Sequence, residues 1–256
     1  MKQLIFSVLM FSCFASKAQL KKTPTDADRL ALEGIIVETY NGSELKDYKD
    51  TLDNYLPKGS VTYRIFVDLK PGYTMQAVFG IAKHELKIET TTEFFNAKRS
   101  GERTGDRIDN ELINQNLLAL DSWLTIGAAT KAHLGIPKTD DKDGSIITKS
   151  FLSKADGLIA SEKVRAVSYF GDDLKFFQDS TKASSFKSTN VSWAVFGGVK
   201  GATADNKILI AQLTTNGKLS YELNLQIGTP TGASMQYVAK DAEGAEIKFD
   251  ALNSKK

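Results

Sequence analysis

The sequence predicts an all-β protein, an antiparallel β-sandwich with one short helix and a long loop-rich region. Short apolar stretches, many of them alternating with polar residues, recur along the chain between turn-forming residues. The Asn216-Gly217 pair separates two of these stretches, and such pairs favour tight hairpins because both residues tolerate positive φ. A helical spacing of apolar residues occurs in one short segment. Packed antiparallel sheets account for the first two observations, and the third predicts the one short helix.

The first two predicted strands cover residues 30–40 and 60–69. The first ends in a β-branched run, and the second carries apolar residues at alternate positions until a Pro-Gly pair ends it. Polar residues such as Arg64 occupy the other face of the second strand, and only Phe66 breaks the alternation. The alternation therefore assigns the apolar residues to one face of this strand and the polar residues to the other.

The middle of the chain is less regular. Residues 75–79 and 85–92 predict two further strands, and residues 121–126 another. In residues 106–118 apolar residues recur three to four positions apart, which predicts the short helix. Charges, glycines and scattered apolar residues in 128–188 predict long loops with one or two hairpins.

The C-terminal part is again rich in predicted strands. They cover residues 192–196, 207–214, 219–227, 235–239 and 246–249. The Asn-Gly pair is expected to join the second and third of these into a hairpin, and the alternation in the third predicts one core face and one wet face. Because no linker or repeat interrupts the chain, we expect a single domain over residues 19–256.

Residues 1–18 have the features of a secretory signal peptide. Lys2 gives a basic start, residues 4–14 form an unbroken apolar run, and small residues precede a cleavage site after Ala18. No later segment approaches the roughly 18 apolar residues of a membrane-spanning helix, so we expect none. The mature protein is therefore expected to be exported, to the periplasm or outside the cell.

Cys13 is the one cysteine, and it lies inside the predicted leader. It could carry the lipid of a bacterial lipoprotein, but the bulky Phe11 makes a poor lipobox, so the unanchored form is preferred. Cleavage leaves a cysteine-free chain without disulfides. It also removes two of the 33 lysines and arginines, so the basic residues then equal the 31 acidic residues in number. The resulting net charge near zero argues against a nucleic-acid partner.

Residues 59–69, 121–127 and 208–215 together resemble an uncharacterised family of secreted β-sandwich modules of Bacteroidota. The resemblance extends from about Leu32 to Val238. It implies an exported envelope or extracellular protein, without indicating an activity. Relatives of this kind often carry a C-terminal sorting domain that this chain does not show, so the resemblance favours a periplasmic or freely released protein.

One acidic loop is a candidate calcium site. Asp141 and Asp143 stand two residues apart before Gly144, as in loops whose oxygen ligands converge on calcium. In an EF-hand register, however, Ser150 occupies the twelfth position, where a bidentate glutamate is required. The alternative is a solvated turn, and calcium is the one cofactor that the sequence leaves open.

Four aromatic residues are candidates for a sugar-binding platform on an exposed sheet face. They are Tyr63, Tyr73, Trp123 and Trp193, whose rings could stack on the apolar faces of sugars. Both tryptophans also stand among apolar neighbours, which is typical of core positions.

No catalytic motif emerges. His84 and His133 have no metal-ligating neighbour at helical or strand spacing, and neither a nucleophile elbow nor a phosphate-binding loop is present. Carboxylates such as Glu89 and Glu93 could form a glycosidase pair only if the fold placed them across a cleft.

The sequence thus favours an exported, non-catalytic envelope or extracellular module with a structural or adhesive role, whose partners would be envelope proteins or glycans. One alternative is a glycan-binding or calcium-assisted adhesion module, which an exposed row of Trp or Tyr would support. The other is a glycoside hydrolase, which a deep cleft with two facing carboxylates would support.

Overall fold

The computed structural model describes residues 22–41, 47–113, 115, 117–140, 158–161, 164–172, 174–178 and 182–255. The predicted leader with Cys13 lies outside these residues, and so do Asp141 and Asp143. Within the described ranges, no helix is both long enough and apolar enough to cross a membrane.

The chain is all-β, as predicted, and most strands belong to three sheets. A four-stranded sheet has the order β1 (Leu32–Asn41), β4 (Val61–Leu69), β13 (Lys207–Thr215) and β7 (Trp123–Leu124). A six-stranded sheet has the order β10 (Ser168–Gly171), β12 (Val191–Val199), β5 (Thr74–Gly80), β15 (Leu225–Gly228), β16 (Ser234–Val238) and β17 (Ile247–Lys248). The third sheet consists of β11 (Ser185–Ser188), β6 (Leu86–Thr90) and β14 (Leu219–Glu222).

Two short strand pairs complete the list, β2 (Tyr48–Lys49) with β3 (Tyr55–Leu56) and β8 (His133–Gly135) with β9 (Leu158–Ala160). Among the described strands, every ladder is antiparallel except the one between β16 and β17.

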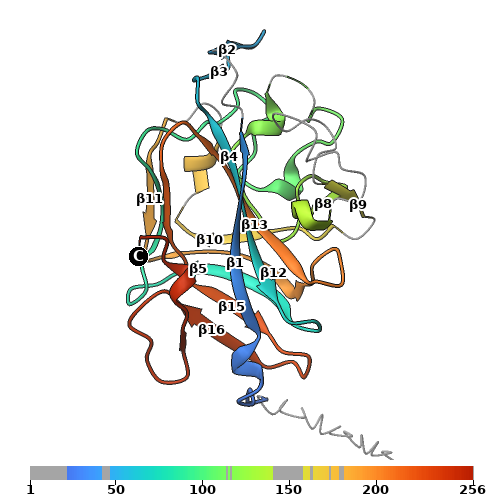
Figure 1. Cartoon of the computed structure of the whole chain (residues 1–256), viewed down its shortest axis with the longest axis vertical. Coiled ribbons are helices and arrows are strands. Elements are labelled where there is room, and N and C mark those ends of the chain that lie inside the picture. The colour runs from blue at the N-terminus through green and yellow to red at the C-terminus, as the bar shows by residue number, and fades with distance from the viewer. Residues whose placement is uncertain are drawn as a thin grey trace, which may run out of the picture.

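The two larger sheets pack face to face around the main core. In Figure 1, β1 and β4 run along the molecule, whereas β5, β12 and β15 run across it behind them. Ile65 and Val67 of β4 join Val78 of β5, Trp193 of β12 and Leu225 of β15 in one buried cluster. Each sheet therefore removes one apolar face from water by covering the other, which is the sandwich that the alternation predicts.

The second face of the four-stranded sheet is buried as well. Phe66 of β4 and Leu209 of β13 are opposite each other and pack with Ile108 and Leu120 from the loops between β6 and β7. These loops form a second, smaller core. Phe66 interrupts the alternation in the sequence because it belongs to this second core.

Polar residues on that face are buried with their partners. Arg64, which the alternation places on the polar face, is almost fully buried, and its Nε donates to Gln212 Oε1 at 2.9 Å. Gln212 Nε2 in turn donates to the backbone oxygens of Ala119 and Asp121, at 3.0 and 2.9 Å. Arg64 of β4 is therefore satisfied by Gln212 of β13, which in turn binds the covering loop, so this polar pair is buried without contact with water.

The predicted hairpin at Asn216-Gly217 is also wrong. β13 pairs with β4 and β7, whereas β14 pairs with β6, so the chain passes between sheets here. Thr215 Oγ1 lies 2.8 Å from Thr90 Oγ1 and 2.9 Å from Thr92 Oγ1, which ties the end of β13 to the end of β6. Glycine is needed because a Cβ at 217 would lie 2.4 Å from Thr90 Oγ1.

The predicted helix over 106–118 is replaced by turns. Asp109 Oδ1 accepts the N–H of Glu111 at 3.0 Å, and Leu117 has a φ of 61°, so the described residues there do not continue one helix. All helical segments of the described chain are 3-10 turns of three or four residues. They are η1 (Asp28–Leu30), η2 (Gly105–Arg107), η3 (Leu118–Leu120), η4 (Lys138–Asp140), η5 (Leu174–Phe177) and η6 (Asp250–Leu252).

Candidate functional site

The four aromatic candidates do not form an exposed platform. Trp123 and Trp193 are 2% and 0% exposed, and the indole N–H of Trp193 donates to the backbone oxygen of Thr125 at 3.1 Å. Tyr63 and Tyr73 are half-buried and pack against the main core. The glycan-platform interpretation is therefore wrong for the tryptophans, because both serve as core residues.

The two glutamates considered as a catalytic pair are engaged in ion pairs. Glu89 accepts hydrogen bonds from Lys255 at 2.7 Å and from Lys187 at 3.0 Å, and these bonds lower the pKa of Glu89 to about 2. Glu93 lies 4.0 Å from Lys182. No group of three or more His, Cys, Asp or Glu side chains that could hold a metal ion occurs among the described residues.

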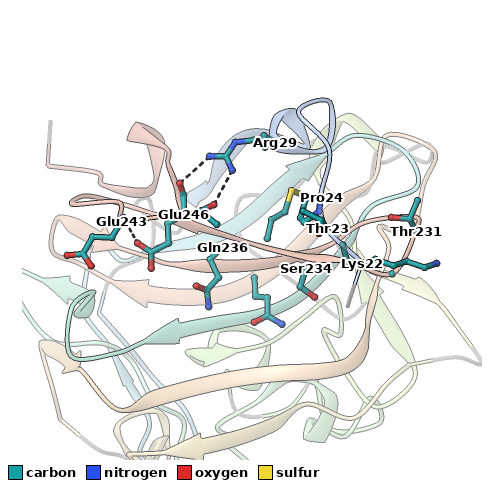
Figure 2. A pocket seen from close by; sticks show the side chains of 14 residues that line it. Lys22, Thr23, Pro24, Arg29, Thr231, Ser234, Gln236, Glu243 and Glu246 are labelled. Carbon is teal, nitrogen blue, oxygen red and sulfur yellow. Dashed lines mark hydrogen bonds between the residues drawn. The ribbon is translucent and has the colours of Figure 1, made fainter. Parts of the chain in front are cut away.

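The structure instead reveals an open groove of about 1030 Å³ beside β16 (Figure 2). Three parts of the chain form it: the segment before η1, the β15–β16 hairpin, and the loop before β17. The lining residues are Lys22, Thr23, Pro24, Arg29, Gln226, Thr231, Gly232, Ala233, Ser234, Met235, Gln236, Glu243, Ala245 and Glu246.

Glutamine side chains dominate one side of the groove. Gln76 Oε1 accepts hydrogen bonds from Gln226 Nε2 and from Ser234 Oγ, both at 2.9 Å. Gln76 itself does not line the groove, but its two bonds hold Gln226 and Ser234 there and leave Gln226 Oε1 without a partner among the described residues. Gln236 is exposed, and its amide makes no hydrogen bond with any described residue. Ser234 and Gln236 point to the same side of β16, as expected two positions apart (Figure 2).

The tip of the β15–β16 hairpin is held by its own hydrogen bonds. The N–H of Thr229 donates to the backbone oxygen of Ala233 at 2.8 Å, and Thr229 Oγ1 accepts the N–H of Ala233 at 2.9 Å. Gly232 has a φ of 87°, a conformation that costs glycine little. The glutamine side of the groove therefore stands on a well-defined hairpin.

The opposite wall is fixed by Arg29. Its guanidinium donates to the backbone oxygens of Ala245 and Glu246, at 3.1 and 3.3 Å (Figure 2). Glu246 Oε2 lies 2.9 Å from Nε2 of the buried His84 and accepts the N–H of Glu243 at 2.8 Å. The loop before β17 is thereby held at both ends.

The segment that carries Arg29 is itself anchored. Asp28 accepts the N–H of Thr25 at 2.7 Å and the hydroxyl of Tyr73 at 2.8 Å, and the Tyr237 hydroxyl donates to the backbone oxygen of Arg29 at 3.0 Å. The backbone bond from Thr25 lowers the pKa of Asp28, and partial burial next to Asp28 raises the pKa of Tyr73 to about 12. Tyr73 therefore positions a wall of the groove.

Two exposed phenylalanines lie on the outer face of the same sheet. Phe170 and Phe196 are 53% and 74% exposed, and their ring centroids are 6.4 Å apart. Ser168 of β10, Ala194 of β12 and Gln226 of β15 lie in one row of paired residues across the sheet, which passes through β5. Phe170 and Phe196 each stand two positions after a member of this row and therefore point to the same side of the sheet. The aromatic pair and the glutamines thus share one face.

Comparison with known proteins identifies no relative. No protein-family model matches the chain, and no curated protein or solved structure matches it. The groove must therefore be understood from its own residues.

Sequence reasoning missed the groove and the aromatic pair for different reasons. The alternation of the strands places Gln226 and Gln236 on a solvent-facing side, but nothing in the sequence distinguishes them from other polar residues as a binding site. Phe196 did give a signal. Trp193 and Val195 mark the buried phase of β12, so the alternation places Phe196 on the solvent side.

Proposed function

We propose that the mature chain is an exported, non-catalytic adhesion module that holds an extended polar chain in the groove beside β16. The observation that carries the proposal is the pair of side-chain amides of Gln226 and Gln236, which line the groove from the adjacent strands β15 and β16 and have hydrogen-bonding groups without a described partner. A groove open to solvent suits a chain that passes through it, whereas small ligands favour enclosed pockets. The predicted leader supports export.

The carboxylates in the groove support a non-catalytic role. Lys83 forms an ion pair with Glu243 and lowers the pKa of that carboxyl group. Glu246 contacts His84 and caps the N–H of Glu243. Acting as a general acid or base would require either glutamate to give up contacts that hold the groove wall.

The test is thermal unfolding of the mature chain, residues 19–256, against soluble polysaccharides, pooled random heptapeptides, calcium and EDTA. A ligand at a hundredfold excess over its Kd adds about 2.7 kcal/mol to the free energy of unfolding and raises the midpoint. Ser234→Arg places a long side chain in the groove and should abolish the shift. Ser184→Arg, at an exposed serine next to β11, is the matched control and should retain it.

Either of two results would contradict the proposal. One is a panel in which no polysaccharide or peptide shifts the midpoint. The other is a ligand whose shift survives Ser234→Arg, because that ligand would bind elsewhere. Turnover of a glycoside substrate by the wild-type chain would separately refute the non-catalytic part.

A second candidate function is glycan binding across the whole outer face of the six-stranded sheet, and the Phe170–Phe196 pair favours it. Exposed aromatic rings stack on the C–H faces of sugars, while amides such as those of Gln226 and Gln236 bind hydroxyls. Phe196→Ala should then weaken binding of a polysaccharide about tenfold, by loss of one stacked ring. Tyr55→Ala removes an exposed ring at β3 and should leave the Kd unchanged.

A further inference from the structure

The groove contains a strand edge that lacks a backbone partner over part of its length. β16 pairs with β15 from Ser234 to Tyr237, but β17 pairs only with Tyr237 and Val238. The rest of that edge faces the groove. An unpaired edge offers backbone donors and acceptors at the repeat of an extended strand.

The hydrogen bonds on either side of this edge fix which residues point outward. The N–H of Thr229 donates to the backbone oxygen of Ala233, so Ala233 and every second residue after it face β15. The N–H of Phe249 donates to the backbone oxygen of Val238, which faces the other way. By this alternation, the backbone groups of Ser234 and Gln236 also point away from β15.

Three of these outward groups are free. The parallel pairing of Tyr237 with Ile247 uses the Gln236 carbonyl, but the N–H of Gln236 and both backbone groups of Ser234 bond no described residue outside the strand. A longer β17 would offer the Ala245 carbonyl to Gln236. That carbonyl accepts Arg29 Nη1 instead, so Arg29 stops the pairing at Ile247.

Nothing in the local sequence protects this edge. Exposed edges usually carry a proline, a lysine or a bulge that prevents pairing with another chain. Residues 234–236 are Ser, Met and Gln, and their pairing with β15 is regular. The edge is short, open and regular, which suits an added strand of about three residues.

We propose that the occupant of the groove is an extended peptide segment of a partner protein, which adds to β16 as a further strand. This proposal rests on the proposed function and names its ligand class. The ligand's backbone would bond Ser234 and the N–H of Gln236, and its alternate side chains would lie beside the glutamines. A peptide fits better than a glycan here because donor and acceptor alternate along the edge at strand spacing, about 6.8 Å between equivalent residues.

The experiment compares two substitutions at one position. Heptapeptides are selected from a random display library on the immobilised mature chain, after removal of those that also bind Ser234→Arg. The Kd of a selected, labelled peptide is then measured by fluorescence anisotropy. Gln236→Ala removes the side-chain amide but keeps the N–H, whereas Gln236→Pro removes both, so the Kd of Gln236→Pro should exceed that of Gln236→Ala at least tenfold. Proline is tolerated at an edge position whose N–H faces solvent.

Folding is controlled independently. Unfolding midpoints show whether Gln236→Pro retains the native fold, and Ser234→Pro removes a second outward N–H if it does not. A further test needs no protein variant: a selected peptide is methylated at every second backbone nitrogen, in two versions that begin at neighbouring residues. Only the version whose methyl groups replace the N–H groups facing β16 should bind at least tenfold more weakly.

The outcomes separate the two proposals. Equal affinities for wild type and Gln236→Pro, or equal losses with Ala and Pro, would overturn strand addition. If no peptide is selected, but a polysaccharide binds and this binding is lost in Ser234→Arg, strand addition would be overturned and the proposed function would stand. Failure of every peptide and polysaccharide to bind would overturn both.

Discussion

Replacement of Asp121 should be among the most destabilising single changes in this protein. Asp121 is fully buried at the end of the loop that covers the four-stranded sheet. Its Oδ1 accepts the N–H of Ala97 at 2.7 Å, and its Oδ2 accepts the N–H of Glu102 at 3.1 Å. One carboxylate therefore closes the loop from Ala97 to Glu102 onto the sheet.

The magnitude follows from these two bonds. A hydrogen bond to a charged group contributes about 1.5–3 kcal/mol, and a buried N–H left without an acceptor costs about 1–3 kcal/mol. Removal of the desolvated charge offsets part of this loss, so Asp121→Ala should lower the free energy of unfolding by about 3–4 kcal/mol. Asp121→Asn keeps an acceptor for Ala97 but turns an NH₂ toward Glu102, and should cost about 2 kcal/mol.

Urea denaturation of residues 19–256, followed by tryptophan fluorescence, measures these differences. Asp109→Asn is the matched control, because Asp109 also accepts a backbone N–H, from Glu111, but lies near the surface. It should cost less than about 1 kcal/mol. Amide exchange at Ala97 and Glu102 should accelerate in both Asp121 variants. An Asp121→Asn curve within about 0.5 kcal/mol of wild type would refute the reasoning.

Three further predictions concern charge, backbone and core. The pKa of Glu89 is lowered from 4.5 to about 2, so its ion pairs add about 1 kcal/mol of stability above pH 4.5 that is lost as the pH falls through 2. Urea midpoints of wild type and Glu89→Gln should differ at pH 6 and converge toward pH 2; a gap independent of pH would contradict this. Gly198→Ala should cost about 2 kcal/mol or more, because φ is 69° and a Cβ would lie 2.7 Å from a hydroxyl, whereas Gly232→Ala, with open space, should cost about 1 kcal/mol. Trp123 and Trp193 should emit at short wavelength and resist quenching by acrylamide, and a quenchable, red-shifted spectrum would show that a tryptophan is exposed.

The alternation of apolar residues predicts the strands well but says little about their partners. Residues 219–227 have one continuous alternation, yet the chain forms β14 and β15 in different sheets. The change occurs at Asn224, a predicted wet position that is buried. Its side chain donates to the backbone oxygens of Phe79 and His84, both at 3.1 Å, and accepts the N–H of Ala239. A polar residue in a strand pattern does not reveal whether water or distant backbone will satisfy it.

The candidate site was still harder to predict because its parts are remote in sequence. Arg29 stands 216 residues before Ala245, whose backbone oxygen it binds, and the glutamine side of the groove comes from a third segment. No local motif encodes such an arrangement. Arg29 binds the backbone oxygens of Ala245 and Glu246, and β17 pairs with β16 only from Ile247 onward. The edge of β16 before Tyr237 is therefore left without a strand partner. Only the tertiary structure reveals that edge.

The location of the groove follows from how the two larger sheets are covered. Loops between β6 and β7 bury the second face of the four-stranded sheet, and Arg64 and Gln212 bond inside that contact. The six-stranded sheet keeps Gln236 and Phe196 exposed on its outer face. A sheet face that is polar, partly aromatic and open at its edge can accept a partner without the unfolding of any covering loop. For this reason, binding by this protein should leave its core unchanged, and the amides that gain protection on ligand binding should be those of Ser234 and Gln236.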